Sequence, residues 1–178
     1  MIYIFIGYLF IFFQITTSIN ISGVPVLPNI IGNIFIIVGI NKLSDRSSNI
    51  SKAKSWTIVI LIYSLLIYVG FVVGMDFSSL PFLILNLITV FVKLYILYLI
   101  DIGIHEIEQT QNIILGSKRL LQIWKVQFLT WTICSLVSLD CVGSLKYVTS
   151  IFTYTAFIIN IVFLINFYKA KKIYDSVQ

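Results

Sequence analysis

Apolar residues gather into six long runs along the chain, and short polar segments separate these runs. The runs lack the strict alternation of apolar and polar positions that is typical of the strands of a membrane barrel. Because lipid offers the backbone no hydrogen-bond partner, runs of this length and composition predict membrane-spanning helices. We therefore expect an all-α, polytopic transmembrane helical bundle that forms one domain over residues 1–178. The six expected spans cover approximately residues 2–17, 24–40, 56–74, 80–100, 124–142 and 147–168.

The segment 101–122 differs from these runs because acidic, amide and basic side chains interrupt its apolar positions. We expect the fourth helix to continue past the membrane here as a cytoplasmic amphipathic stalk. Gly116 then marks the end of that helix, and Ser117 is positioned to cap the next one.

Composition excludes a soluble globular domain and a disordered chain. Of the 178 residues, 59% are hydrophobic and 11% are charged, whereas a soluble domain carries about 25% charged residues. Too few polar residues remain to cover a surface that faces water. We therefore expect a multi-pass protein of the cell (cytoplasmic) membrane.

The net charge of +5 follows membrane topology and is not concentrated in a patch that would bind nucleic acid. With six spans, ten of the twelve basic residues fall on one side, Lys146 falls on the other side, and Lys93 falls within a span. Cytoplasmic loops carry the excess of Lys and Arg, so both termini are expected in the cytoplasm. The ten residues are Lys42, Arg46, Lys52, Lys54, Lys118, Arg119, Lys125, Lys169, Lys171 and Lys172.

Polar side chains inside membrane spans are costly and therefore mark candidate sites. Asn86, Thr89 and Lys93 lie at positions i, i+3 and i+7 of the fourth span, so they share one helix face. This stripe is either part of a polar cavity that contacts an ion or a solute, or a face whose lysine snorkels over ~10 Å to water. From the sequence alone we favour snorkelling.

Three other spans carry stripes of small or weakly polar residues at helical spacing. The second span carries Asn29 and Asn33, the fifth begins its stripe at Gln127, and the sixth carries Asn160. Such stripes are typical of helix–helix contacts in membranes, and we favour packing as their role. In the alternative interpretation, Asn29, Asn33 and Asn160 join the stripe of the fourth span in a path for a solute.

The third span contains a GxxxG motif that begins at Gly70 and ends at Gly74. This motif lets a second helix approach closely, either within the molecule or in a homo-oligomer. We favour packing within the molecule.

Asp101, His105 and Glu108 lie at positions i, i+4 and i+7 on one face of the expected stalk. They form a weak candidate for a divalent metal site. The favoured alternative is a solvated helix face beside the lipid headgroups, and we expect no cofactor.

Several short segments carry a resemblance to a group of bacterial proteins. The first segment is the run Leu27-Pro28-Asn29-Ile30-Ile31-Gly32-Asn33, which is followed by a basic stretch that ends at Lys54. The second segment contains Glu106 and Glu108, which precede Lys118, Arg119 and Trp124. With them the chain resembles uncharacterised small multi-span membrane proteins of clostridia-like, low-GC Gram-positive bacteria. The resemblance implies a location in the bacterial cytoplasmic membrane and assigns no activity.

The residues show no catalytic constellation. The spans contain no serine–histidine pair, and the chain has no GxxxxGK[ST] loop. We therefore expect a non-enzymatic membrane protein that acts through helix packing and through a membrane-protein partner or a second copy of itself, as an accessory, regulatory or immunity-type subunit. The alternative is a small-solute or ion transporter or channel that uses the stripe of Asn86, Thr89 and Lys93.

Overall fold

The computed structural model describes residues 1–17, 26–75, 80–138 and 146–177, and these residues are almost entirely helical. The expectation of an all-α chain is confirmed. Within these residues there are six α-helices and one short 3-10 helix, η1. Their bounds are α1 Ile2–Thr17, α2 Val26–Leu43, η1 Ser44–Arg46, α3 Ser48–Val72, α4 Leu80–Gln111, α5 Ser117–Ser138 and α6 Lys146–Val177.

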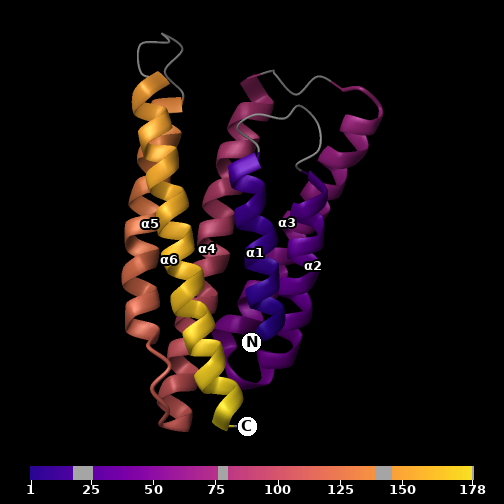
Figure 1. The fold of residues 1–178 in the computed structure, drawn as a ribbon. Helices are drawn as coiled ribbons and strands as arrows, with labels where there is room; N and C mark the ends of the chain where they lie inside the picture. Colours follow the sequence, from indigo (N-terminus) through magenta and orange to yellow (C-terminus); the bar gives the residue numbers. More distant parts are fainter. Residues whose placement is uncertain (18–25, 76–79, 139–145, 178) are drawn as a thin grey trace.

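The six α-helices pack in chain order around a ring. Each helix contacts the next one along the chain, and α6 returns to contact α1 (Figure 1). Both termini lie at one end of the ring, together with η1 and the turn between α4 and α5 (Figure 1). We call this end the terminal end. The inner faces of the helices therefore meet at a common centre.

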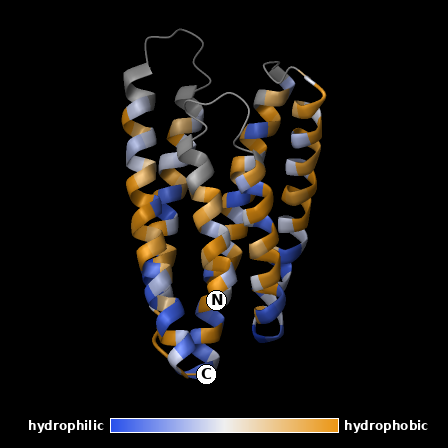
Figure 2. Cartoon of the chain, turned by 45° about the vertical axis from the view of Figure 1, so that its right-hand side comes forward, coloured by the Kyte–Doolittle hydropathy of each residue, from blue (hydrophilic) through white to orange (hydrophobic). Residues whose placement is uncertain are grey.

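Four of the helices are long and apolar enough to cross a membrane, by length and composition: Leu27–Arg46, Ser48–Val72, Ile84–Gln111 and Ser150–Val177. Within α1, the segment Ile2–Phe12 is apolar but shorter than these four. Figure 2 shows apolar residues along the length of the bundle and hydrophilic residues gathered at the terminal end. The chain is therefore a multi-span membrane protein with at least these four candidate spans among its described residues.

We expected one stalk over residues 101–122. This segment instead contains the end of α4, a turn and the start of α5. Helix α4 ends at Gln111, where Asn112 turns into the left-handed region with a φ of 51°. We expected Gly116 to end α4. It instead directly precedes α5. The carbonyl of Gly116 accepts from the N–H groups of Arg119 and Leu120, so Gly116 and not Ser117 stands at the start of α5.

Gly70 and Gly74 differ from the expected pair of packing glycines. Gly70 is buried within α3, but the helix ends at Val72, before Gly74. Gly74 has a φ of 81°, and a Cβ added there would meet nothing within 4 Å. The N–H of Met75 donates to the carbonyl of Gly70, which is the bond of a glycine-terminated helix end. Gly74 therefore ends α3, and no helix of the described residues packs against it.

Helices α1 and α2 approach each other closely where both helices carry glycine. A Cβ on Gly7 would lie 2.6 Å from the carbonyl oxygen of Gly32 and 3.0 Å from the amide nitrogen of Ile36. A Cβ on Gly39 would lie 2.8 Å from the amide nitrogen of Ile4. The backbones of α1 and α2 can approach this closely only because glycine has no side chain.

A buried apolar core fills the ring towards its terminal end. Its fully buried side chains include Ile40 late in α2, Ile50 early in α3, Ile104 late in α4 and Phe167 in the second half of α6. Because these positions lie at one level of the ring, the core closes the ring there. The space that remains open lies further from the terminal end.

Candidate functional site: a cavity at the centre of the ring

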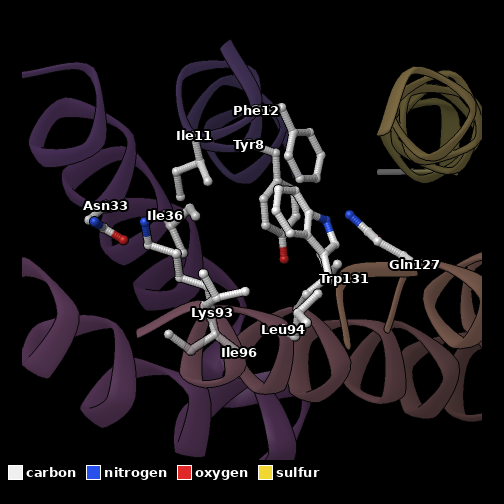
Figure 3. Close-up of a pocket in the computed structure, with 12 residues that line it drawn as sticks. Tyr8, Ile11, Phe12, Asn33, Ile36, Lys93, Leu94, Ile96, Gln127 and Trp131 are labelled. Carbon is white, nitrogen blue, oxygen red and sulfur yellow. The ribbon is translucent and has the colours of Figure 1, made fainter. Parts of the chain in front are cut away.

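A cavity of about 80 Å³ lies at the centre of the ring, between α1, α2, α4 and α5 (Figure 3). Most of its wall is aliphatic or aromatic, and five of its side chains carry polar groups. A mainly apolar cavity with a few polar groups is the usual form of a small-molecule site. The lining residues are Tyr8, Ile11, Phe12, Asn33, Ile36, Val90, Lys93, Leu94, Ile96, Leu97, Gln127 and Trp131.

Lys93 brings the only positive charge to this wall. Its half-buried side chain extends from α4 across the cavity towards Asn33 and Ile36 of α2 (Figure 3). Within the part of the chain that the structure describes, Lys93 makes no hydrogen bond or ion pair, and the ion pair present joins Lys171 to Asp175. An ammonium removed from water without a partner is costly. The cavity therefore offers three N–H donors to a bound anion or to water.

Asn33 faces Lys93 and is held in place from α2 and α3. Its amide nitrogen donates to the carbonyl oxygen of Asn29 at 2.8 Å and to Oδ1 of Asn29 at 3.2 Å. Asn29 in turn donates to the hydroxyl of Ser64 on α3 at 2.8 Å. These bonds occupy the nitrogen of Asn33 and leave its oxygen for the cavity, on the side of Lys93 (Figure 3).

Gln127 carries a second amide to the opposite side of the cavity. Its Nε2 donates to Oδ1 of Asn160 on α6 at 2.6 Å. The other two amide atoms, Oε1 of Gln127 and Nδ2 of Asn160, are buried without a hydrogen-bond partner among the described residues. The pair therefore fixes α5 to α6 and keeps one acceptor and one donor free for a ligand or water.

Tyr8 of the cavity wall and Asp101, one helical turn beyond Leu97, add further polar groups to this part of the ring. The ring of Tyr8 packs edge-on against Phe163 and Phe167 of α6, and its hydroxyl points from α1 towards α4 (Figure 3). Asp101 of α4 is completely buried and its charge acts on Tyr8. In the described residues neither the hydroxyl of Tyr8 nor either carboxyl oxygen of Asp101 has a hydrogen-bond partner.

The structure divides the stripe that we expected on the fourth span. Asn86 is exposed and accepts a bond from the hydroxyl of Tyr63 at 3.0 Å, and Thr89 donates to the carbonyl of Leu85 at 2.9 Å. Neither residue lines the cavity, whereas Lys93 does. Lys93 therefore lies at a cavity, as in the first of the two interpretations that the sequence offered for this stripe.

The asparagines of the alternative solute path lie around the cavity at different depths. Asn33 lines the cavity, Asn29 supports Asn33, and Asn160 supports Gln127. These three positions and Lys93 are therefore brought to one place, while Asn86 and Thr89 are not.

Asp101, His105 and Glu108 do not converge, and no three His, Cys, Asp or Glu side chains of the described residues are placed to hold a metal ion. Asp101 is buried, which differs from the solvated face that we favoured. His105 Nδ1 lies 2.7 Å from the hydroxyl of Ser117, and Glu108 accepts from the N–H of Ser117 at 2.9 Å. A carboxylate at a helix N-terminus is stabilising, so Glu108 fastens the start of α5 to α4.

Sequence reasoning did not single out Tyr8, Trp131 or Gln127 as site residues. Tyr8 belongs to a set of buried positions at helical spacing in α1, with Ile4, Ile11 and Phe12. That spacing identifies the inner face of α1, but an aromatic residue on an inner face is typical of packing. Gln127 had the clearer signal, because it stands at one end of a polar stripe.

No family model, curated protein or solved structure matches the chain. Function is therefore inferred from the geometry of the cavity and its polar groups.

Proposed function

We propose that this chain is a six-span membrane protein that binds a small anionic solute in the central cavity and carries it across the membrane. The observation that supports this function is the unpaired ammonium of Lys93, which faces the oxygen of Asn33 inside a closed ring of apolar helices. A buried cation of this kind attracts a ligand of opposite charge.

The cavity limits the size and character of the ligand. Its volume of about 80 Å³ suits a small molecule, and Phe12 and Trp131 present aromatic surface to it. Lys93 provides a point charge, and Asn33 and Gln127 provide directional polar groups. A short monocarboxylate with an apolar body satisfies all three parts of the wall.

Six spans are supported by the ring itself. Helices α1 and α5 pack between or beside the four candidate spans and complete the closed ring. A helix that forms one wall of a membrane-embedded ring must cross with its neighbours, because lipid would otherwise meet the polar cavity.

Aromatic pairs join α4 to both of its neighbours in the ring and support a closed wall around the cavity. The ring of Trp56 on α3 contacts that of Tyr95 on α4, with centroids 5.8 Å apart. The ring of Tyr98 contacts that of Trp124 on α5 at 4.6 Å.

The basic residues favour the cytoplasm for the terminal end. Lys42 lies over the ring of Tyr3, 4.2 Å from its centroid, and Lys171 lies 5.8 Å from the centroid of Tyr168. Because cytoplasmic segments carry the excess of basic residues, we place both termini in the cytoplasm, which agrees with the bacterial cytoplasmic membrane that the sequence resemblance implies.

The test is binding and uptake of radiolabelled butyrate and benzoate by purified protein in lipid vesicles, with Lys93→Gln compared with Lys125→Gln. Lys125 is an exposed lysine of α5 and serves as the matched control. A hydrogen bond to a charged group contributes about 1.5–3 kcal/mol, so Lys93→Gln should weaken carboxylate binding roughly tenfold or more, while Lys125→Gln leaves it unchanged. Equal binding and uptake by wild type and Lys93→Gln would exclude the proposed function.

One observation favours the alternative of a partner-binding subunit. Ile114, in the turn between α4 and α5, is 83% exposed and lies close in sequence to the exposed basic residues Lys118 and Arg119. An exposed apolar residue at the hydrophilic end of the bundle is typical of a docking point. Purification from native membranes distinguishes the two functions, since a stoichiometric partner that is lost in Ile114→Ser supports the alternative.

A further inference from the structure

Asp101 lies in α4 one helical turn beyond Leu97, which lines the central cavity. Its side chain has no exposed surface, and both of its carboxyl oxygens lack a hydrogen-bond partner within the described residues. Buried carboxyl groups are normally hydrogen-bonded or paired with a cation. A buried carboxyl group with neither a hydrogen bond nor a cation is unusual, and this indicates that a proton or an ion binds there.

Tyr8 is the neighbour that connects this carboxyl group to the cavity. Its ring forms part of the cavity wall, and its hydroxyl is buried without a hydrogen-bond partner among the described residues. The charge of Asp101 acts on this hydroxyl. The two side chains come from α1 and α4, on opposite sides of the ring. A proton or ion held at Asp101 therefore lies next to the cavity that contains Lys93.

Other charged groups near Asp101 are engaged elsewhere or directed outward. On α4, Lys93 lies two helical turns earlier, about 12 Å along the axis, and His105 contacts Ser117. From α3 and α5, which pack against α4, the charged residues towards this end are exposed or half-buried at the surface. They are Lys52, Lys54, Lys118, Arg119 and Lys125.

The free oxygens at this position suit a proton better than a metal ion. Hard metal ions take six or more oxygen ligands, commonly several from the protein. Among the described residues, Asp101 and Tyr8 supply three unpartnered oxygens, and the carbonyls of α4 are used within the helix. A proton needs a single oxygen, and it converts the carboxylate into a neutral acid whose burial is far less costly.

We propose that Asp101 is a proton-exchange site that is coupled to the anion site at Lys93. The carboxylate takes up one proton to form an O–H bond and becomes a neutral acid, and it returns to the carboxylate when that proton leaves. An anion on Lys93 and a proton on Asp101 enter together without net charge, so the pair makes the cavity a proton–anion symporter. The coupling depends on the proposed function, whereas proton exchange at Asp101 does not.

Proton exchange is measured by infrared difference spectroscopy of the purified protein in lipid, recorded during an acid-to-alkaline titration. The titration should reveal the C=O band of a protonated carboxylic acid that disappears in Asp101→Asn. Asp45→Asn, at an exposed acid of η1, should keep the band. Tyr8→Phe should shift the position of the band or the midpoint of its titration, because it removes the neighbouring hydroxyl. A spectrum that is unchanged by Asp101→Asn would overturn the proposal.

Coupling is measured with the vesicles used for butyrate uptake. A pH gradient should drive accumulation in the wild type, and Asp101→Asn should lose this accumulation while it still exchanges labelled for unlabelled butyrate. If Asp101→Asn fails to fold, Asp101→Glu should keep the infrared band at a shifted frequency. Accumulation by Asp101→Asn equal to that of the wild type would overturn the coupling. Absence of butyrate transport in every variant would overturn the proposed function. In that case the infrared result alone would decide whether Asp101 exchanges a proton.

Discussion

Gln127 and Asn160 each bond through one half of the amide group and leave the other half open. The bond between them is 2.6 Å long and joins α5 to α6 inside the bundle. An amide has both donor and acceptor groups, so this single bond cannot satisfy either side chain completely. Asn33 shows the same arrangement, with its nitrogen bonded to Asn29 and its oxygen left for the cavity. Residues of this kind can join two helices and still leave a polar atom without a partner.

We predict a measurable coupling between Gln127 and Asn160 in a double-mutant cycle with Gln127→Leu and Asn160→Leu. Hydrogen bonds between membrane helices contribute about 0.6 kcal/mol on average and at most about 1.7 kcal/mol. The short buried bond should give a coupling free energy towards the upper part of that range, measured by reversible unfolding in mixed micelles. Additive effects of the two substitutions would show that the bond contributes nothing to stability.

At the scale of elements, the α1–α2 contact depends on glycine. Gly7, Gly32 and Gly39 lie where the two backbones meet, and an added Cβ on any of them would come within 3.0 Å of a backbone atom. Neither backbone can shift far, because α1 also contacts α6 and α2 also contacts α3 in the ring.

Gly7→Ala should therefore destabilise the protein by about 1–3 kcal/mol, which is the usual cost of an overpacked core. Leu9→Ala is the matched control, because Leu9 is exposed on the outer face of the same helix. Thermal unfolding in detergent should show a lower midpoint for Gly7→Ala and a nearly unchanged midpoint for Leu9→Ala. Equal midpoints would mean that the close approach of α1 and α2 is not a determinant of stability.

The sequence was sufficient to predict six helices but not all of their ends. Long apolar runs identify the membrane portion of each helix, since lipid permits little else. Helix ends in water depend on single contacts that a pattern does not reveal. Glu108, for example, holds the start of α5 through the N–H of Ser117, and the positive φ of Asn112 ends α4 ahead of the glycine that we expected to end it.

The candidate site was predictable only where polarity alone marks a residue. Lys93 and Asn33 stand out in apolar runs, and the structure brings both to the cavity. Asn86 shares a helix face with Lys93 but lies beyond the cavity, because the depth of the cavity depends on how the ring closes. Asp101 follows the apolar run and looks solvated in the sequence, yet the ring buries it completely.

At the scale of the whole molecule, the ring has one end filled by apolar core and a polar cavity further along its axis. The core around Ile40, Ile50 and Ile104 separates the cavity from the terminal end. A solute in the cavity would need this core to open before it could leave on that side. The apolar core therefore restricts the access of a solute from the terminal end to the cavity that Lys93 lines.

Cysteine accessibility tests whether Lys93 lies in a water-accessible cavity inside the membrane. Lys93→Cys and Leu66→Cys are prepared in a background with Cys134→Ser and Cys141→Ser, since Leu66 is 66% exposed on the outer apolar face of α3. A small charged methanethiosulfonate is added to vesicles that contain each variant. Lys93→Cys should react because it lines a cavity that water enters, and Leu66→Cys should not react because it faces lipid. A Lys93→Cys variant as unreactive as Leu66→Cys would show that water does not reach this position.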